Sequence, residues 1–334
     1  MQTAGRGHRG LLLSSVKLLV AFSGYSGQNK LIRPDGSVST LSLPPGNTGD
    51  PGGLCFSPDN SNLLMVHSKN NTGNKQATLY NVLTAEVITR LPQYTTNDSG
   101  KYPQYSPDGQ YVAISCYTGT PALVVFRTSD WSVVTLPETP THCEMTKWAP
   151  DSSALLCATG NAPYLWIYNV GETWTRRAVA FGTGTTPVGF VSGIGMNPNG
   201  ENFILGVPNT SPKWASYQYP SLNIMPHLTP SPPHIWNPGG IRIEFNAAAS
   251  MVAITCESGD KFYVYDMATR VRKTLPTELT ATHIMDVAFS KKGNLMATTV
   301  YGDAPYARVY NAATMTQIPL PITLTNGVRN VAMG

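Results

Sequence analysis

Residues able to do chemistry are spread thinly along this chain of 334 residues. None of its six histidines belongs to a His-x-x-x-His or Glu-flanked metal-binding pattern. The sequence contains no Gly-x-Ser-x-Gly nucleophile motif and no phosphate-binding glycine loop. We therefore expect no catalytic residues, no metal site and no cofactor, and we interpret the chain as a non-enzymatic protein.

The five cysteines do not indicate a metal site either. Their number is odd, and no two have the spacing of metal ligands. Because free cysteine is among the most buried residue types, we predict that they pack in the interior without forming a disulfide, a redox or disulfide role being the alternative. The cysteines are Cys55, Cys116, Cys143, Cys157 and Cys256.

Composition narrows the class of partner. Only 13% of the residues are charged, against about 25% in a typical soluble domain, and Thr, Ser and Asn supply the polarity instead. The net charge is +4, and basic pairs such as Arg176-Arg177 and Lys291-Lys292 are scattered. We expect no specific nucleic-acid partner. No apolar stretch reaches the ~20 residues of a membrane span, so none is predicted.

A repeated turn predicts the secondary-structure elements of the chain. In Ser106-Pro107-Asp108-Gly109 the proline presets the backbone for a type I turn, and an aromatic residue, Tyr105, precedes it. Related turns follow an aromatic or Met anchor every 43 to 49 residues. The anchors are Phe56, Tyr105, Trp148, Met196, Phe245, Phe289 and Met333. A fixed period of this length is typical of a repeat architecture.

A second marker follows each of the first six anchors by 20 to 24 residues and closes an apolar strand. A short turn and another strand usually come next. Each period thus contains four short strands, the pattern of a propeller blade. The markers are Tyr80-Asn81, Phe126-Arg127, Tyr168-Asn169, Tyr217-Gln218, Tyr265-Asp266 and Tyr310-Asn311.

These features resemble the WD40 family. The segments Tyr265 to Thr269 and Tyr310 to Thr314 are similar to its Trp-Asp position, and the Phe-Ser-Pro-Asp turns are similar to its first hairpin. The Gly-His and Trp-Asp dipeptides are both missing, so the resemblance is to a divergent WD40-like repeat. It implies an all-β, seven-bladed β-propeller of four-stranded antiparallel blades. TolB-type and lactonase-type propellers share the same turn and stay open as alternatives.

The two ends of the chain are expected to share one blade. Residues 16–42 contain three strands without a preceding anchor, and the final segment 328–333 matches the inner strand at 284–289. We predict that this C-terminal strand joins the N-terminal three and closes the ring, which removes exposed sheet edges. Residues 1–15 then form an N-terminal arm and 16–334 a single propeller domain. The alternative gives residues 9–13 their own strand and leaves the C-terminus as a tail.

The longer connections are expected to carry binding, because long loops on a rigid scaffold have the reach that tight turns lack. These connections are residues 68–75, 93–101, 181–192 and 226–240, all expected on one face of the ring. The predicted partner-binding residues are Lys69, Asn71, Asn74, Tyr94, Phe190, His234 and Trp236.

We interpret the chain as a non-catalytic interaction or structural propeller whose partners are other proteins of a larger assembly. The sparse charge favours a phage or viral virion component, such as a tail, collar or receptor-binding part, with a host surface glycan or receptor as a further partner. Virion localisation follows from this, cytoplasmic localisation being the alternative. The competing interpretations are an intracellular WD40 scaffold and a propeller enzyme, glycan binder or small-ligand binder that uses the axial channel.

Overall fold

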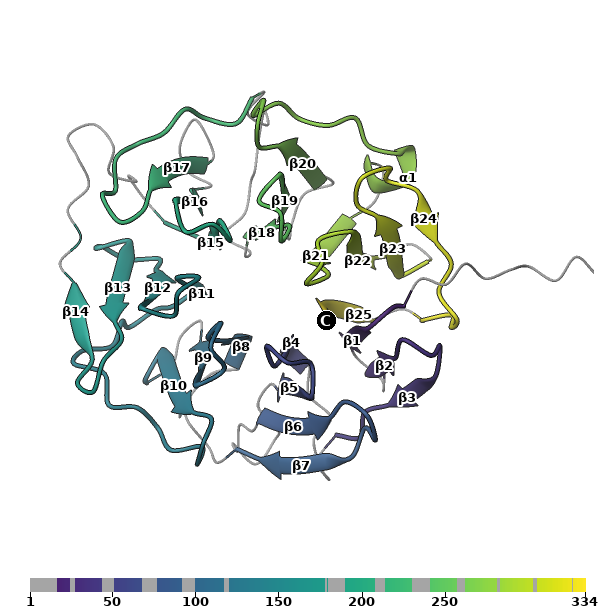
Figure 1. The fold of residues 1–334 in the computed structure, drawn as a ribbon, viewed down its shortest axis with the longest axis horizontal. Coiled ribbons are helices and arrows are strands. Elements are labelled where there is room, and N and C mark those ends of the chain that lie inside the picture. Colours follow the sequence, from purple (N-terminus) through teal and green to yellow (C-terminus); the bar gives the residue numbers. More distant parts are fainter. Residues whose placement is uncertain are drawn as a thin grey trace, which may run out of the picture.

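Seven small antiparallel sheets are arranged around a central axis in the computed structural model (Figure 1). The structure describes residues 17–24, 28–43, 51–67, 77–91, 100–116, 120–177, 179, 190–207, 214–229, 241–256, 262–280, 283–302, 305–325 and 327–334. The predicted all-β, seven-bladed propeller is confirmed. The N-terminal arm, 1–15, lies outside the described residues.

We number the blades from the one that contains both chain ends and give their strands from the axis outward. Blade 1 consists of β25 (Val328–Met333), β1 (Val20–Gly24), β2 (Lys30–Ile32) and β3 (Val38–Thr40). Blade 2 consists of β4 (Pro51–Phe56), β5 (Asn62–His67), β6 (Ala77–Asn81) and β7 (Val87–Arg90). Blade 3 consists of β8 (Gly100–Tyr105), β9 (Tyr111–Cys116) and β10 (Leu123–Arg127).

Blade 4 consists of β11 (Met145–Trp148), β12 (Ala154–Ala158), β13 (Leu165–Asn169) and β14 (Thr175–Arg177). Blade 5 consists of β15 (Gly193–Met196), β16 (Asn202–Gly206) and β17 (Trp214–Gln218). Blade 6 consists of β18 (Ile241–Phe245), β19 (Met251–Cys256) and β20 (Phe262–Asp266). Blade 7 consists of β21 (His283–Phe289), β22 (Leu295–Tyr301), β23 (Ala307–Asn311) and β24 (Gln317–Ile318), and a one-turn helix, α1 (Thr277–Thr280), precedes it.

The innermost strand of every blade ends at the predicted anchor residue. The turns after the anchors are held by their own side chains. In blade 2, Asp59 Oδ1 accepts hydrogen bonds from Ser57 Oγ at 2.6 Å and from the Ser61 backbone N–H at 3.0 Å. In blade 3, Ser106 Oγ donates to Asp108 at 2.5 Å, and Gly109 adopts a φ of 75° that suits glycine. These short turns therefore form a firm rim on one face, which we call the short-turn face.

The fourth, outermost strand is incomplete in three blades. In blades 3, 5 and 6 the described residues at this position make only isolated bridges, Phe126 to Val133, Tyr217 to Ile224 and Tyr265 to Arg272. Residues 229 and 271 also form a parallel bridge that connects the outer segments of blades 5 and 6. The prediction of four strands per blade holds as an architecture, although the perimeter is less regular than the centre.

The predicted closure of the ring is confirmed. Strand β25 pairs antiparallel with β1, with Val331 opposite Phe22, and lies between the inner strands of blades 7 and 2 (Figure 1). The last residue continues this pairing, because the Gly334 N–H donates to the Leu19 carbonyl at 3.1 Å. The C-terminus is thus a strand of the ring, and the alternative of a C-terminal tail is excluded.

In blade 1 no turn joins the first two strands, because β25 and β1 come from opposite ends of the chain. Lys291 of blade 7 supplies contacts at this position instead. Its Nζ donates to the carbonyls of Ser57 and Pro58 in blade 2, at 2.6 and 2.7 Å, and also to the side chain of Asn60. This one side chain connects blades 7 and 2 across the end of blade 1. Burial lowers the pKa of Lys291, and the nearby Asp59 carboxylate opposes this shift.

Apolar clusters between neighbouring blades make up the core. The cluster between blades 3 and 4 contains Cys143 and Cys157, both fully buried, with their Sγ atoms 2.6 Å apart. Cys55, Cys116, Cys143 and Cys157 are free thiols, and the side chain of Cys256 lies outside the described part. The expectation of five free thiols stays a prediction. Cys143 and Cys157 are the pair whose free state tests it most directly, because their sulfur atoms are close together.

Candidate functional site

A cavity of about 370 Å³ lies at the axis of the ring and is lined by six of the seven inner strands. The same two positions of each strand line it, namely the third residue before the anchor and the residue directly before the anchor. We call this cavity the axial chamber. The inner layer of its wall comprises Gly53, Tyr102, Met145, Arg242, Asp286 and Asn330; the outer layer, nearer the turns, comprises Cys55, Gln104, Lys147, Glu244, Ala288 and Ala332.

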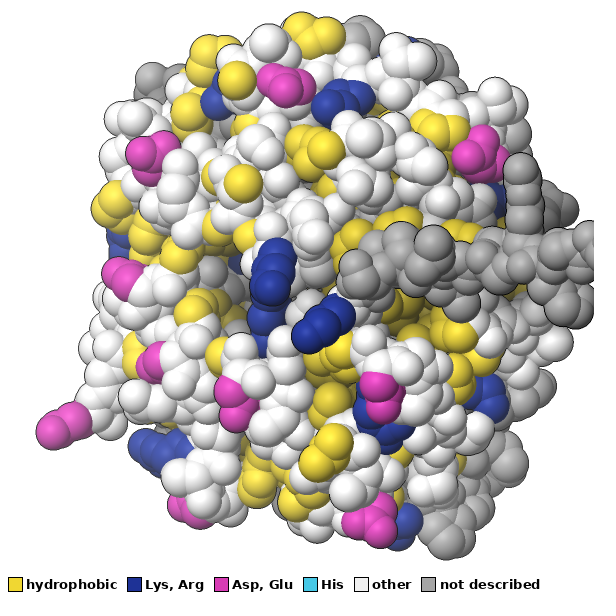
Figure 2. Space-filling model, turned by 45° about the vertical axis from the view of Figure 1, so that its right-hand side comes forward, with side chains coloured by type: hydrophobic (Ala, Val, Ile, Leu, Met, Phe, Trp, Pro, Cys, Tyr) yellow, Lys and Arg dark blue, Asp and Glu magenta, His cyan; other side chains and the backbone are white. Residues whose placement is uncertain are grey.

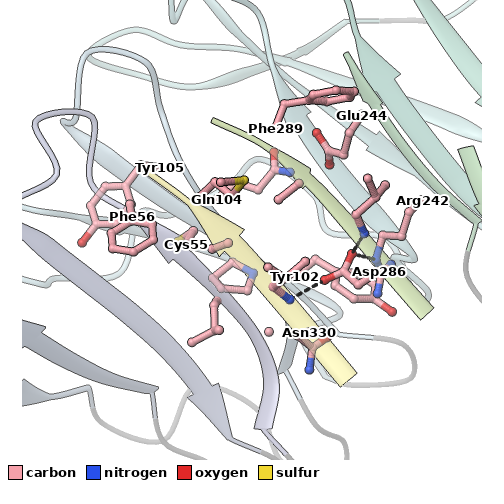
Figure 3. Close-up of a pocket in the computed structure, with 18 of the residues that line it drawn as sticks. Cys55, Phe56, Tyr102, Gln104, Tyr105, Arg242, Glu244, Asp286, Phe289 and Asn330 are labelled. Atoms are coloured by element: carbon pink, nitrogen blue, oxygen red, sulfur yellow. Dashed lines mark hydrogen bonds and ion pairs between the residues drawn. The ribbon is translucent and has the colours of Figure 1, made fainter. Parts of the chain in front are cut away.

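The inner layer is crossed by a chain of contacts that joins four blades. The Arg242 guanidinium of blade 6 lies 3.3 Å from the ring centroid of Tyr102 in blade 3. Arg242 Nε also donates to Asp286 Oδ1 of blade 7 at 3.1 Å, and Asp286 Oδ2 accepts the backbone N–H of Val331 in blade 1 at 3.0 Å. Figure 3 shows Tyr102, Arg242 and Asp286 together at one end of the cavity. The inner end of the chamber is therefore lined by polar groups that contact one another.

The outer layer contains a second ion pair that passes over blade 5. Lys147 Nζ of blade 4 donates to Glu244 Oε1 of blade 6 at 2.5 Å. The corresponding residues of blade 5 are Gly193 and Gly195, and β15 packs so closely on β18 that a Cβ on Gly195 would lie 2.4 Å from Cγ2 of Ile243. Because glycine has no side chain, Lys147 reaches across blade 5 to Glu244. The glycines thus permit a contact between blades that are not neighbours.

The chamber reaches the surface at the short-turn face. Exposed turn residues Pro58, Pro107 and Lys291 line its outer end. Phe56 and Tyr105 lie at this end in Figure 3. A second hollow of about 350 Å³ adjoins it and shares Tyr105, Pro107 and Lys147 with the chamber. These two hollows therefore open on the face opposite the one where the sequence placed the binding loops.

The chamber is better suited to binding than to proton transfer. Each of its carboxylates already faces a cation, at 2.5 Å for Glu244 and 3.1 Å for Asp286. Burial raises the pKa of Asp286, although Arg242 and the Val331 N–H oppose the shift. Burial also raises the pKa of the Cys55 thiol, which disfavours the nucleophilic thiolate. No cluster of three or more His, Cys, Asp or Glu side chains able to hold a metal ion occurs in the part of the chain that the structure describes.

Most of the predicted partner-binding residues lie outside the described residues: Lys69, Asn71, Asn74, Tyr94, His234 and Trp236. Phe190 is described and is half-buried. Its ring packs edge-on against His142 at 5.6 Å between centroids, and it covers Gly160, where a Cβ would lie 2.6 Å from its Cε2 atom. His142 in turn contacts Glu144 at 2.6 Å. Phe190 is therefore partly engaged in packing between blades 4 and 5.

The axial residues were missed in the sequence analysis, although a signal for them exists. Arg242 and Asp286 each stand three residues before an anchor, and Lys147 and Glu244 each stand one residue before an anchor. A charged side chain in an otherwise apolar inner strand is uncommon because burying an unpaired charge is costly. Comparing the repeats position by position from their anchors would have brought these four residues together.

Charged side chains are sparse on the outer surface, as the low content of charged residues in the sequence predicts. Figure 2 shows an oblique view in which single acidic and basic side chains are scattered among uncharged ones, with several Lys or Arg side chains near the middle. Among the described residues, large hydrophobic side chains are exposed mainly at the perimeter, for example Val133, Ile224 and Val271. A search of the described helices found no segment with the length and apolarity of a membrane span.

Comparisons with known proteins define the fold and nothing finer. No protein-family model matches the sequence, and no curated protein matches it either. Among solved structures, the chain is similar to the β-propeller domain of Cps50 (Swd1) from Myceliophteria thermophila, with a TM-score of 0.59 and 10% sequence identity. The match covers 83% of this chain and 87% of that one. The fold is that of a seven-bladed β-propeller, and the sequence is divergent from that of the similar domain.

Proposed function

We propose that this protein is a non-catalytic interaction module, a rigid seven-bladed ring that binds other proteins within a larger assembly. The observation that carries the proposal is the pairing of charges at the axis. Lys147 with Glu244 and Arg242 with Asp286 hold the blades together, and neither carboxylate is left to act as a general acid or base. A propeller whose axial charges serve the ring itself is suited to presenting surfaces.

The long-connection face remains the predicted partner surface. Residues 68–75, 93–101, 181–192 and 226–240 come from several blades, so we expect them to supply a broad patch together instead of a pocket. A standard interface buries about 800 Å² per partner, which a patch of this extent can provide. Trp236 is the predicted anchor, with Asn and Thr side chains around it.

Lysine cross-linking of the protein in extracts of its source tests both the interaction and the face. Lys69, Lys75 and Lys101 mark the long connections, while Lys291 and Lys292 mark the short-turn face. We expect intermolecular cross-links at the first group, and a loss of about 2 kcal/mol in partner affinity with Trp236→Ala at nearly unchanged thermal stability. Cross-links confined to the second group would overturn the face assignment. A protein that sediments as a monomer without intermolecular cross-links would overturn the interaction proposal.

Within this class we propose a virion component, such as a tail, collar or receptor-binding part, and its support is the 13% content of charged residues. The test is mass spectrometry of purified particles from the source beside the soluble cell fraction. Enrichment in particles in fixed ratio to other particle proteins is expected. Recovery in the soluble cell fraction alone would favour the intracellular scaffold instead.

A further inference from the structure

The outer layer of the axial chamber has one polar side and one open side. Gln104, Lys147 and Glu244 of blades 3, 4 and 6 form the polar side. The open side is formed by Ala288 and Ala332, whose small side chains line the cavity next to the axis. The volume of about 370 Å³ falls within the range of about 300–1,000 Å³ that is usual for small-molecule sites. The asymmetry indicates space for a compact ligand beside a wall that can form hydrogen bonds.

The charges on this wall compensate one another. A charged ligand would have to compete with Glu244 for Lys147, or with Asp286 for Arg242, and would leave the displaced partner buried without its counter-charge. Asp286 and Arg242 are each less than 10% exposed, so water cannot readily replace the lost partner. The chamber therefore disfavours both anions and cations, and it favours a neutral ligand.

Donors and acceptors alternate around the same wall. Ammonium and guanidinium groups only donate hydrogen bonds, ionised carboxylates only accept them, and the Gln104 amide does both. The Gln104 side chain lines the chamber and makes no hydrogen bond to any residue that the structure describes. A hydroxyl group both donates and accepts, so a ligand with several hydroxyls can use mixed groups without displacing either ion pair.

Aromatic rings stand at the mouth of the chamber. Phe56, Tyr105 and Phe289 are anchors of blades 2, 3 and 7, and all three line the cavity. Phe56 is buried in the core between blades 1 and 2, so the partly exposed rings of Tyr105 and Phe289 are the ones that a ligand can contact. Apolar and aromatic walls with a few convergent polar groups are the usual make-up of a ligand site. Rings of this kind can cover the C–H faces of a compact ligand whose edges carry hydroxyls.

From these observations we propose that the axial chamber binds a neutral saccharide of one or two rings, entering from the short-turn face. The site is separate from the partner surface on the long connections. Its failure would leave the protein-interaction proposal standing, because partner cross-links at Lys69, Lys75 and Lys101 are measured independently.

Saturation-transfer NMR with the full-length protein tests the proposal. The neutral probes are galactose, mannose, N-acetylglucosamine, lactose and maltose; the anionic probes are glucuronic acid and N-acetylneuraminic acid. We expect saturation transfer to at least one neutral probe and none to the anionic probes. Isothermal titration then gives the dissociation constant of the best neutral probe for each variant.

Two variants and one matched control locate the site. Gln104→Ala removes the unpaired amide and should weaken binding at least fivefold, while Ala288→Trp fills the open side and should abolish it. Gln110→Ala removes the same side chain from an exposed turn of the same blade and should leave affinity unchanged. Melting temperatures show whether each variant is folded. If Ala288→Trp does not fold, Gln104→Ala alone decides whether the saccharide binds in the axial chamber.

Three results would each overturn the proposal. The first is no saturation transfer to any neutral probe with the wild-type protein. The second is unchanged affinity in folded Gln104→Ala and Ala288→Trp proteins, which would place binding elsewhere. The third is tighter binding of an anionic probe than of every neutral one, which would refute the ligand class.

Discussion

Replacing Asp286 should destabilise the ring, because this one carboxylate connects three blades. It accepts hydrogen bonds from Arg242 Nε at 3.1 Å, from the Val331 N–H at 3.0 Å and from its neighbour Val287 at 3.0 Å. Arg242 is only 7% exposed as a residue, and Asp286→Ala leaves its buried guanidinium without its carboxylate partner. Removing one partner of a buried pair costs about 3–5 kcal/mol. We expect a loss of about 4 kcal/mol in the free energy of unfolding.

That loss converts into a shift of melting temperature. An unfolding entropy of about 2.1 cal/mol/K per residue gives roughly 700 cal/mol/K for the 334 residues. A loss of about 4 kcal/mol then lowers the melting temperature by about 6 °C if the ring unfolds as one unit. Differential scanning calorimetry measures the shift, and hydrogen exchange at the Val331 amide shows whether the closing strand opens first.

A double-mutant cycle separates the ion pair from other effects. Arg242→Met combined with Asp286→Ala removes both charges, so the pair of substitutions should cost at least 2 kcal/mol less than the sum of the single ones. Asp130→Ala is the matched control, because Asp130 is an exposed turn residue whose carboxylate bonds locally to Ser132, with the Ser132 N–H at 2.9 Å, and it should cost less than about 1 kcal/mol. Additive single effects, or a loss below 1 kcal/mol for Asp286→Ala, would refute this account of closure.

Four further predictions concern the whole ring. Burial lowers the pKa of His67 from 6.5 to about 4, so the unfolded chain binds a proton first as pH falls. The contribution of His67 to the free energy of unfolding is therefore fully present above pH 6.5 and should fall by about 3 kcal/mol by pH 4, at 1.36 kcal/mol per pH unit. Urea unfolding of His67→Gln should show a smaller drop over this range. Deleting residues 328–334 should open the ring and cause aggregation in size-exclusion chromatography, whereas a monomeric, folded product would contradict closure by β25. Lys291→Met should cost about 1 kcal/mol in urea unfolding and Lys292→Met almost nothing, so equal effects would exclude the inter-blade contacts. Thiol labelling of the denatured protein should find five free cysteines, and a count of three would reveal a disulfide.

The centre of the fold was predictable because it repeats. The anchors Phe56 to Met333 mark the ends of the inner strands, and the match between segments 284–289 and 328–333 predicted the closing strand. The perimeter was less predictable, since Val133, Ile224 and Val271 are about half exposed and their segments make only single bridges. A strand that buries little apolar surface leaves a weak pattern in the sequence.

The two axial ion pairs could not be predicted from the sequence for a different reason. Lys147 and Glu244 are 97 residues apart, and they meet only because the blade between them has glycine at the equivalent position. The turn signals fix each blade separately, whereas the contacts across the axis depend on how closely the assembled blades approach one another. Comparison from the anchors identifies the residues that face the axis, but the choice of partners comes from the closed ring.

The composite blade also sets an order of events during synthesis. Domains generally fold from the N-terminus as the chain is made. Here β1 emerges first and β25 last, and the two pair only when residues 328–333 have been translated. Until then β1 lacks its inner neighbour and presents an unpaired edge. The ring therefore stays open until residues 328–333 have been made, and its closure is the last step in the assembly of the seven blades.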